Sequence, residues 1–368
     1  MKSANNSPIG VAVIGGGLRS RIARFLFDDG VVLRSIYDPD RKRAAERAAE
    51  LGFPGAEVCT SACGAMRTEG VSWVMVFSPN HAHCQDILCA LSCGCDVFSE
   101  KPLATSMEDC LRIASAVKSS GRTLFTGFVL RHAPVYRKIK EILDAGTLGK
   151  IISVEADNLS GADLGSYIMR NWRRLRANAG PYILEMGCHE LDLLRWFIGA
   201  PPVRGASFGG LNYFVPEHRE AQDRNPELFN AIPDPHGEKS PFVSDKDILD
   251  NQVAILEYAS GARATLHLNL ASAMPERRLF IIGTLGCLEL AGGVIRCRML
   301  GEKAERRYDL PAQFEYADRE IMEDLRRTMT DKESAGTSGR EGLETAFAAL
   351  KLDQAQREGR VVDIREEF

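Results

Sequence analysis

The first third of the chain alternates short hydrophobic runs with segments of helical periodicity. The runs are rich in β-branched and aromatic residues and predict five strands: Val11–Ile14, Val32–Tyr37, Trp73–Phe77, Asp96–Ser99 and Thr123–Gly127. Between the runs, apolar residues recur every three or four positions, as on one face of a helix. This alternation predicts right-handed crossovers and a doubly wound parallel sheet, so we expect an α/β domain over residues 1–128.

The pattern changes after Phe128. Helices are predicted at Val135–Leu143, Pro181–Phe197, Arg319–Met329 and Gly339–Arg357. Strands are predicted at Ile151–Ala156, Asn251–Tyr258, Ala262–Leu270, Arg278–Ile282, Cys287–Leu290 and Val294–Arg298. The last five strands follow one another without helices, which favours an antiparallel or mixed sheet. We therefore expect an α+β domain over residues 129–368 with a mostly antiparallel sheet.

Residues 213–250 differ from their surroundings, because they contain five prolines, many charges and little periodicity. Long segments of this kind are usually lids, interaction arms or disordered stretches. We expect a long loop insertion here.

Charge and composition narrow the range of partners. The net charge is −4 and no basic stripe is present, which argues against nucleic acid and anionic membranes as partners. No apolar run is long enough to span a bilayer, and residues 1–10 lack the apolar stretch of a signal peptide. We therefore expect a cytoplasmic protein.

The chain has ten cysteines, seven of them between Cys59 and Cys110, and none forms a CxxC pair. This spacing does not suit a zinc site, so we expect no bound metal. The cysteines are expected to be small buried apolar residues in a reducing compartment.

A glycine-rich turn follows the first predicted strand. Gly15 and Gly17 occupy the first two glycine positions of a GxGxxG motif, and Ser20 replaces the third. Gly15 permits the tight turn, and Gly17 lets the backbone approach a pyrophosphate. Leu18 and Arg19 open the following helix, where free N–H groups face that pyrophosphate. The turn therefore predicts a dinucleotide site.

Asp38 ends the next strand, 23 residues beyond Gly15. A carboxylate there binds both hydroxyls of the adenosine ribose and repels a 2′-phosphate, which favours NAD over NADP. Arg41 and Arg43 lie close enough to soften that preference. The alternative is that Asp38-Pro39-Asp40 is only a turn and a helix cap.

Two further loops follow strands at the edge of the sheet where ligands bind. One contains Ser78, Asn80 and His83, and the other contains Glu100 and Lys101. We assign these residues to the cofactor site. Asn80 is alternatively a cap for the next helix, and Lys101 is alternatively an ordinary surface lysine.

Three polar residues, Glu185, His189 and Asp192, are spaced i, i+4 and i+7 within a predicted helix, so they share one face. Spacing alone favours a solvated face with no chemical role.

Three motifs together resemble the glucose–fructose oxidoreductase and inositol dehydrogenase family. They are Glu100-Lys101-Pro102 after a strand, the Gly127-Phe128…Arg131…Pro134 segment, and Glu185-xxx-His189-xx-Asp192. The likeness covers nearly the whole chain. It implies a Rossmann domain, a C-terminal domain with a large open sheet, and oxidation or reduction of sugars, cyclitols or similar polyols with NAD(P). It also implies homodimers or homotetramers formed through that sheet.

The resemblance assigns roles to several residues. Lys101 is expected to bind the reacting hydroxyl on the nicotinamide side, and His189 to act as the general base. The family often has Asp where this chain has Glu185, which leaves the role of Glu185 open. Trp172 and Arg173 resemble a tryptophan–arginine pair that some members place near the nicotinamide.

The residues give a concrete mechanistic hypothesis. Hydride leaves a carbon of the substrate for the nicotinamide, while His189 accepts the hydroxyl proton. Lys101 stabilises the developing alkoxide, and Glu185 or Asp192 orients the imidazole.

Three alternatives remain at this stage. The first is an NAD-dependent glycosidase, which oxidises its substrate transiently, eliminates the aglycone, adds water and releases no NADH. The second concerns the substrate: Arg131, Arg173, Arg174 and Arg176 suit an acidic or sulfonated sugar, unless they only form ion pairs. The third is an NAD-binding protein without catalysis.

Overall fold

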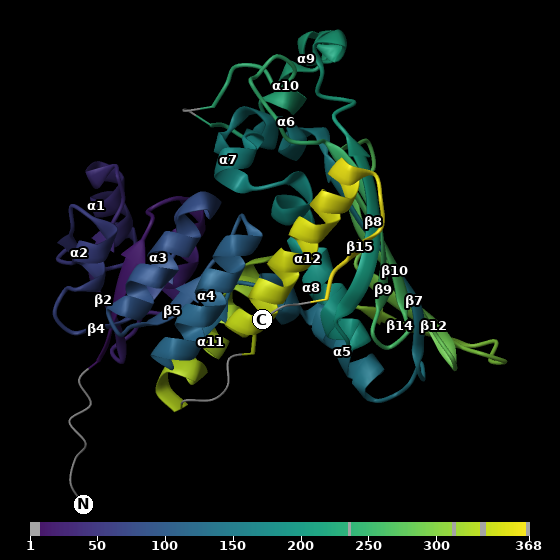
Figure 1. The fold of residues 1–368 in the computed structure, drawn as a ribbon, viewed down its shortest axis with the longest axis horizontal. Coiled ribbons are helices and arrows are strands. Elements are labelled where there is room, and N and C mark those ends of the chain that lie inside the picture. The colour runs from purple at the N-terminus through teal and green to yellow at the C-terminus, as the bar shows by residue number, and fades with distance from the viewer. Residues whose placement is uncertain (1–7, 235–236, 311–313, 332–335, 366–368) are drawn as a thin grey trace, which may run out of the picture. The chain divides into compact units, whose positions relative to one another are not determined.

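The computed structural model describes residues 8–234, 237–310, 314–331 and 336–365 (Figure 1). These residues form two compact units. Unit 1 contains the described residues of Met1–His132 and Gln313–Glu344, and unit 2 contains those of Ala133–Ala312 and Thr345–Glu367.

Unit 1 is built on a six-stranded sheet in the order β3-β2-β1-β4-β5-β6, with every neighbouring pair parallel. The strands are β1 (Ile9–Ile14), β2 (Val31–Tyr37), β3 (Glu57–Val58), β4 (Val71–Val76), β5 (Asp96–Ser99) and β6 (Leu124–Thr126). The central strands are almost wholly buried, as expected where helices cover both faces of a parallel sheet. The predicted α/β Rossmann fold is confirmed, and the strand order reverses between β1 and β4.

The helical elements of unit 1 are η1 (Leu18–Phe25), α1 (Arg41–Glu50), α2 (Ala62–Met66), α3 (Asn80–Ser92), α4 (Met107–Ser120), η2 (Val129–His132) and α11 (Phe314–Asp331). The side chain of Asp40 caps α1, and that of Ser106 caps α4. The helix that follows the glycine turn, η1, is a 3₁₀ helix, which is wound more tightly than an α-helix.

Helix α11 lies far from the first strands in sequence, yet it groups with them. It packs against η1 and η2, and the Arg326 guanidinium donates to the carbonyl oxygen of Leu26 and to the carboxylate of Asp28. The boundary expected at residue 128 therefore does not describe unit 1 completely.

Unit 2 is built on a nine-stranded sheet in the order β14-β13-β12-β11-β7-β10-β9-β8-β15. The strands are β7 (Ile151–Gly161), β8 (Pro202–Gly210), β9 (Asn251–Tyr258), β10 (Arg263–Ser272), β11 (Glu276–Gly283), β12 (Gly286–Ala291), β13 (Val294–Met299), β14 (Glu305–Asp309) and β15 (Val362–Asp363). Among the described strands of this sheet, β7 and β10 are the only neighbours that pair in parallel. This confirms the predicted large, mostly antiparallel sheet.

The helical elements of unit 2 are α5 (Pro134–Asp144), α6 (Ala162–Arg170), η3 (Trp172–Arg174), α7 (Arg176–Ala179) and α8 (Tyr182–Ile198). Helix α12 (Gly339–Glu358) contributes its last turns. Helix α8 packs on β7, β9 and β10. In the part of the chain that the structure describes, no helix is both long and apolar enough to cross a membrane.

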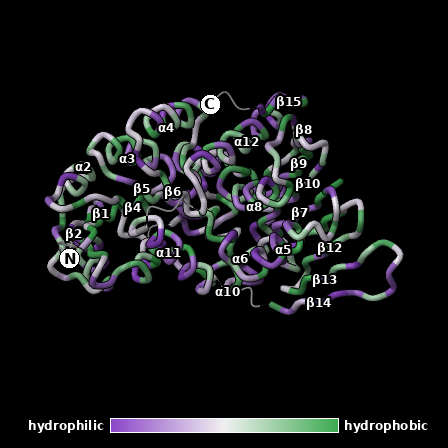
Figure 2. Tube along the Cα trace, turned by 90° about the horizontal axis from the view of Figure 1, so that it is seen from below, coloured by the Kyte–Doolittle hydropathy of each residue, from purple (hydrophilic) through white to green (hydrophobic). Residues whose placement is uncertain are grey.

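Burial alternates along β9 and β10, and in β10 the buried positions are also the hydrophobic ones; Figure 2 colours the trace by hydropathy. In β10, Ala264, Leu266, Leu268 and Leu270 are buried, whereas the residues between them are not. On the other face, Phe208 is 70% exposed beside Val253, its partner on β9. This face therefore presents apolar side chains among charged ones.

The insertion at 213–250 is not only a loop, because it contains η4 (Pro216–His218), α9 (Glu220–Arg224) and α10 (Pro226–Phe229). Three phenylalanines, Phe214, Phe229 and Phe242, pack against one another and are fully buried. The Ser166 hydroxyl of α6 donates to the carbonyl oxygen of Phe229. An aromatic cluster thus gives the insertion a core of its own, which its proline content did not indicate.

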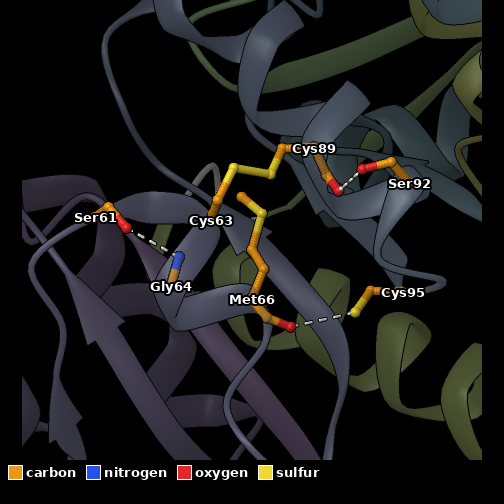
Figure 3. The surroundings of a disulfide bond; sticks show 7 residues. All are labelled: Ser61, Cys63, Gly64, Met66, Cys89, Ser92 and Cys95. Carbon is orange, nitrogen blue, oxygen red and sulfur yellow. Dashed lines mark hydrogen bonds between the residues drawn. A yellow bond between two sulfur atoms is a disulfide. The ribbon is translucent and has the colours of Figure 1, made fainter.

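The cysteine prediction is wrong for one pair. Cys63 of α2 and Cys89 of α3 form a disulfide (Figure 3). The two helices pack side by side and bring the Cα atoms within 6.3 Å, which is within the usual range for a disulfide. Cys63 and Cys89 are 26 residues apart, and this spacing in the sequence did not indicate that they pair. Six other cysteines are buried: Cys59, Cys84, Cys95, Cys110, Cys188 and Cys297.

Candidate functional site

The turn after β1 requires glycine at its first position. Gly15 has φ of +95°, and a Cβ there would lie 2.7 Å from the carbonyl carbon of Phe77. Its N–H donates to the carbonyl oxygen of Tyr37. The turn is therefore held between the ends of β2 and β4, at the point where the strand order reverses.

Gly17 serves a different purpose. A Cβ there would meet nothing within 4 Å, so its missing side chain leaves open space in front of η1. No side chain caps the N-terminus of η1, where Leu18 and Arg19 follow. The Ser20 hydroxyl donates to the carbonyl oxygen of Gly17 and replaces the third glycine without loss of the turn. Open space beside uncapped N–H groups fits a pyrophosphate, so the residues of this turn are suited to a dinucleotide.

Asp38 is 4% exposed, and both of its carboxylate oxygens are occupied. Oδ2 accepts from the N–H of Gly16 at 2.8 Å and from Arg43 Nε at 3.0 Å. Oδ1 accepts from the N–H of Asp40 at 2.8 Å and from Arg43 Nη2 at 2.6 Å. Burial raises the pKa of Asp38, but the bonds from Arg43, Gly16 and Asp40 outweigh it and lower the pKa.

The carboxylate is thus an ion, and Arg43 shields its outer side. The sequence pattern placed Arg43 near Asp38 but did not predict that both guanidinium nitrogens would bind it.

The loop after β4 forms a compact polar cluster. The Ser78 hydroxyl donates to Asp86 Oδ2 at 2.6 Å. His83, which is 1% exposed, has both ring nitrogens within 2.7 Å of backbone carbonyl oxygens, those of Pro102 and Ser78. Asn80 is buried as the first residue of α3, and the N-cap is Pro79, so Asn80 is not the helix cap.

The Glu100–Lys101 loop after β5 is fixed through Glu100. Arg19 Nε donates to Glu100 Oε1 at 2.6 Å, and the Lys101 N–H donates to Glu100 Oε2 at 3.3 Å. Arg19 Nη1 also donates to Asp318 of α11 at 2.6 Å. A Cβ at Gly127 would lie 3.1 Å from Glu100 Oε2, so a larger residue there would require this carboxylate to shift by a few tenths of an ångström. The Arg19 side chain thus links the glycine turn to the loop that carries Lys101.

Arg131 has a structural partner within unit 1. It is 5% exposed, and its Nη1 donates to Glu341 Oε1 at 2.7 Å. Glu341 in turn forms a capping box with Ser338 at the start of α12. The Arg131 guanidinium therefore binds the carboxylate that caps the start of α12.

The polar face of α8 is not solvated. Glu185 is 8% exposed and Asp192 is 1% exposed. His189, which lies between these two residues in the sequence, is half-buried. A Cβ at Gly187 would lie 2.9 Å from Leu268 Cδ1, so the helix approaches β10 closely at this residue. His189 is two residues beyond Gly187, which corresponds to a rotation of roughly 200° around the helix. Because Gly187 faces β10, the His189 side chain points away from the sheet.

Arg173 is held beside Trp172 in η3. Its guanidinium carbon lies 4.2 Å from the centroid of the Trp172 ring, and its Nε donates to Glu185 Oε1 at 2.8 Å.

The neighbouring arginines are also paired with carboxylates. Arg174 binds Asp245 and Glu238 of the insertion, and Arg176 binds both oxygens of Asp353. Each arginine that the sequence offered for an acidic ligand therefore has an internal carboxylate partner.

Unit 1 thus brings Gly15, Gly17, Asp38, Ser78 and Lys101 to the loops that follow β1, β2, β4 and β5. Unit 2 brings Trp172, Arg173, Glu185 and His189 to η3 and α8. The sequence pattern missed Asp86 and Asp318, because the first looks like an ordinary helix residue and the second lies 299 residues from Arg19.

Comparison with known proteins agrees with this arrangement. Residues 9–128 match a family described as "Oxidoreductase family, NAD-binding Rossmann fold", and residues 136–289 match "GFO/IDH/MocA C-terminal domain". Inositol 2-dehydrogenase of Gluconacetobacter diazotrophicus is 36% identical over 197 residues, which cover 52% of this chain and 53% of that protein. The 2,7-anhydro-N-acetylneuraminate hydratase of Escherichia coli is 24% identical over 288 residues, 78% of this chain and 67% of that one.

The chain spans between 52% and 61% of the length of three curated relatives that it matches, among them two inositol 2-dehydrogenases. Among solved structures, scyllo-inositol dehydrogenase of Lactobacillus casei with bound NAD(H) and scyllo-inositol has a TM-score of 0.74 at 22% identity, covering 97% of this chain and 99% of that one. That likeness shows a shared fold. The two family matches show that the chain belongs to the GFO/IDH/MocA family of oxidoreductases, which has an NAD-binding Rossmann fold.

Proposed function

We propose that the chain is an NAD-dependent oxidoreductase that transfers hydride between nicotinamide and the hydroxyl-bearing carbon of a neutral sugar or cyclitol. The observation that carries this proposal is the glycine turn of unit 1, in which Gly17 leaves open space before the uncapped start of η1. The loop that carries Lys101 is tied to that same turn through Arg19 and Glu100.

The cofactor proposal is NAD rather than NADP. Asp38 is a buried, ionised carboxylate, and such a group repels a 2′-phosphate. Gly15, Gly17, Leu18, Arg19 and Asp38 hold the dinucleotide in this proposal, with Ser78, Asn80, Glu100 and Trp172 as further contacts. The dinucleotide, when bound, supplies the nicotinamide ring that accepts or returns the hydride.

The chain's own residues supply the acid–base chemistry. Lys101 donates a hydrogen bond to the developing alkoxide and stabilises its charge. His189 accepts the hydroxyl proton, since an imidazole titrates near neutrality. Asp192 holds the imidazole, and Glu185 braces Arg173 against Trp172.

A neutral substrate is favoured by the pairing of the arginines. Arg131, Arg174 and Arg176 are each bound to carboxylates of this chain, and Arg173 is bound to Glu185. A substrate carboxylate or sulfonate would have to replace one of these partners. The relatives named inositol dehydrogenases are consistent with a neutral polyol.

A second candidate function is an NAD-dependent glycosidase or related eliminase, in which transient oxidation is reversed and no NADH is released. The name of the E. coli relative, a hydratase, favours it, because hydration is a redox-neutral reaction. The ordered insertion at 213–250 also offers extra surface for an aglycone.

The test is a panel of cyclitols, neutral sugars, uronates, sulfosugars and aryl glycosides, incubated with NAD and with NADP. We expect NADH to accumulate with a neutral polyol. Aglycone release without NADH selects the glycosidase. Tight NAD binding without turnover of any compound would leave a non-catalytic NAD-binding protein and would refute the proposal.

We also propose a homodimer or homotetramer formed through the open face of the nine-stranded sheet, where Phe208, Val253 and Ile255 are exposed. Apolar side chains of this size on one sheet face are typical of an interface. Light scattering of Phe208→Asp, compared with the unaltered chain, would show dissociation if this proposal is right and an unchanged mass if it is wrong.

A further inference from the structure

His83 has a hydrogen-bonding environment that a neutral imidazole does not satisfy. Its Nδ1 lies 2.7 Å from the carbonyl oxygen of Pro102, and its Nε2 lies 2.7 Å from the carbonyl oxygen of Ser78. A carbonyl oxygen can only accept a hydrogen bond, whereas a neutral imidazole has one N–H donor and one acceptor nitrogen. Only the imidazolium form donates to both carbonyls.

The surroundings supply a balancing charge. Asp86 lies one turn further along α3 and is 9% exposed, and it accepts a hydrogen bond from the Ser78 hydroxyl. Burial raises the pKa of Asp86, and the hydrogen bond from the Ser78 hydroxyl and the imidazoles of His83 and His81 offset this rise only in part. A cation at His83 has the Asp86 carboxyl group as its neighbour one turn along the same helix.

The two carbonyls belong to the two loops of unit 1 that carry Ser78 and Lys101. Ser78 follows β4, and Pro102 follows Lys101 in the loop after β5. These strands are parallel neighbours, with Val76 opposite Ser99. A side chain that donates to both carbonyls fixes the distance between the loops and so fixes the backbone at Lys101.

We propose that His83 is a doubly protonated positioning residue that clamps the Lys101–Pro102 loop to the Ser78 loop, rather than a residue that contacts the cofactor. The clamp acts on the reaction only through Lys101, so its kinetic effect rests on the proposed function. Its protonation state does not depend on that function.

Neutron diffraction of deuterium-exchanged crystals of the unaltered chain tests the protonation state directly. At a pD of about 8, an ordinary exposed imidazole is neutral. We expect deuterons on both Nδ1 and Nε2 of His83. One deuteron on the His83 ring at this pD would overturn the proposal, whether or not the chain proves to be an oxidoreductase.

The kinetic test uses His83→Gln, with His81→Gln as the matched control on the exposed side of the same helix. A glutamine amide donates from one nitrogen only, so one carbonyl loses its partner. We expect kcat to fall about ten- to hundredfold, since displacement of a catalytic group by about 1 Å has an effect of this size. We expect the NADH dissociation constant to stay within about threefold, because the glycine turn is unchanged.

Equal kcat values for His83→Gln and His81→Gln would show that the clamp does not position Lys101. A loss of NADH affinity with unchanged kcat would show that His83 contacts the cofactor instead. If His83→Gln does not fold, as judged by circular dichroism, the neutron result on the unaltered chain still decides the proposal.

Discussion

The two groups of candidate residues are positioned by different means. In unit 1 the candidates lie in loops that follow parallel strands: backbone contacts hold the glycine turn and His83, and the ion pairs of Arg19 hold the loop of Lys101. In unit 2 the candidates lie on helices, and side-chain ion pairs such as Arg173–Glu185 hold them. We therefore expect substitutions in unit 1 to separate binding from chemistry cleanly, and substitutions in unit 2 to affect chemistry and substrate affinity together.

The largest effect is expected for Lys101→Met. Methionine keeps the length of the side chain but removes the charge and the donor, so turnover should fall by roughly a thousandfold or more, as for removal of a key electrostatic group. NADH affinity, measured by fluorescence, should change less than about threefold, because Asp38 and the glycine turn are untouched. Lys118→Met, at an exposed position of α4, is the control. Full turnover in Lys101→Met would refute the role of Lys101.

The next largest effect is expected for His189→Gln in unit 2. Loss of a general base lowers kcat by about a hundred- to ten-thousandfold. The rate of the unaltered chain should fall as pH decreases through neutrality, because protonated imidazole cannot accept a proton, and this limb should disappear in the variant. His218→Gln, on the exposed η4, should behave like the unaltered chain. An unchanged acid limb in His189→Gln would assign the base elsewhere.

Two alanine variants of the glycine turn should have different effects: Gly15→Ala should lower the stability of the fold, and Gly17→Ala should weaken NADH binding. Gly15 has a positive φ and a close backbone contact, so its alanine variant should lose at least about 1–3 kcal/mol of unfolding free energy. Gly17 has open space around it, so its alanine variant should melt like the unaltered chain but bind NADH about tenfold more weakly. Thermal melting and fluorescence titration measure the two effects. Equal NADH affinity in Gly17→Ala would show that the pyrophosphate does not lie there.

The smallest effect is expected for Arg43→Ala. Without its cation, Asp38 repels a 2′-phosphate more strongly, so the ratio of the NADPH to the NADH dissociation constant should rise about tenfold, or roughly 1.4 kcal/mol. Lys42→Ala, the exposed neighbour on α1, is the control. A ratio that falls in Arg43→Ala would mean that Arg43 mainly obstructs the 2′-phosphate.

The sequence predicted the elements that carry a strong hydrophobic period. The helix predicted at Pro181–Phe197 is α8 at Tyr182–Ile198, with Gly199 in the left-handed conformation at its end. Strand β8 was missed, because Gly205, Gly209 and Gly210 weaken its pattern. The structure explains one of these glycines, since a Cβ at Gly205 would lie 2.7 Å from Leu352 Cδ2. Strand β14 was missed because it is an edge strand of mostly charged residues.

The candidate site was predictable where chemistry follows local sequence. The glycine turn, Asp38 and Lys101 each come directly after a strand, so their position at one edge of the sheet follows from the parallel topology. The bond of Arg19 to Asp318 was not predictable, because nothing in the sequence brings α11 back to unit 1. The burial of Glu185 and Asp192 was also hidden, since spacing alone is the same for a solvated face.

The central claim is that the chain moves hydride between a neutral polyol and nicotinamide. The most direct test is mass spectrometry of the nicotinamide after incubation of the chain with NAD and a polyol deuterated at its hydroxyl-bearing carbons. We predict that deuterium is recovered in NADH, and that Lys101→Met loses this transfer while still binding NADH. Absence of deuterium from the nicotinamide for every polyol tested would contradict the claim.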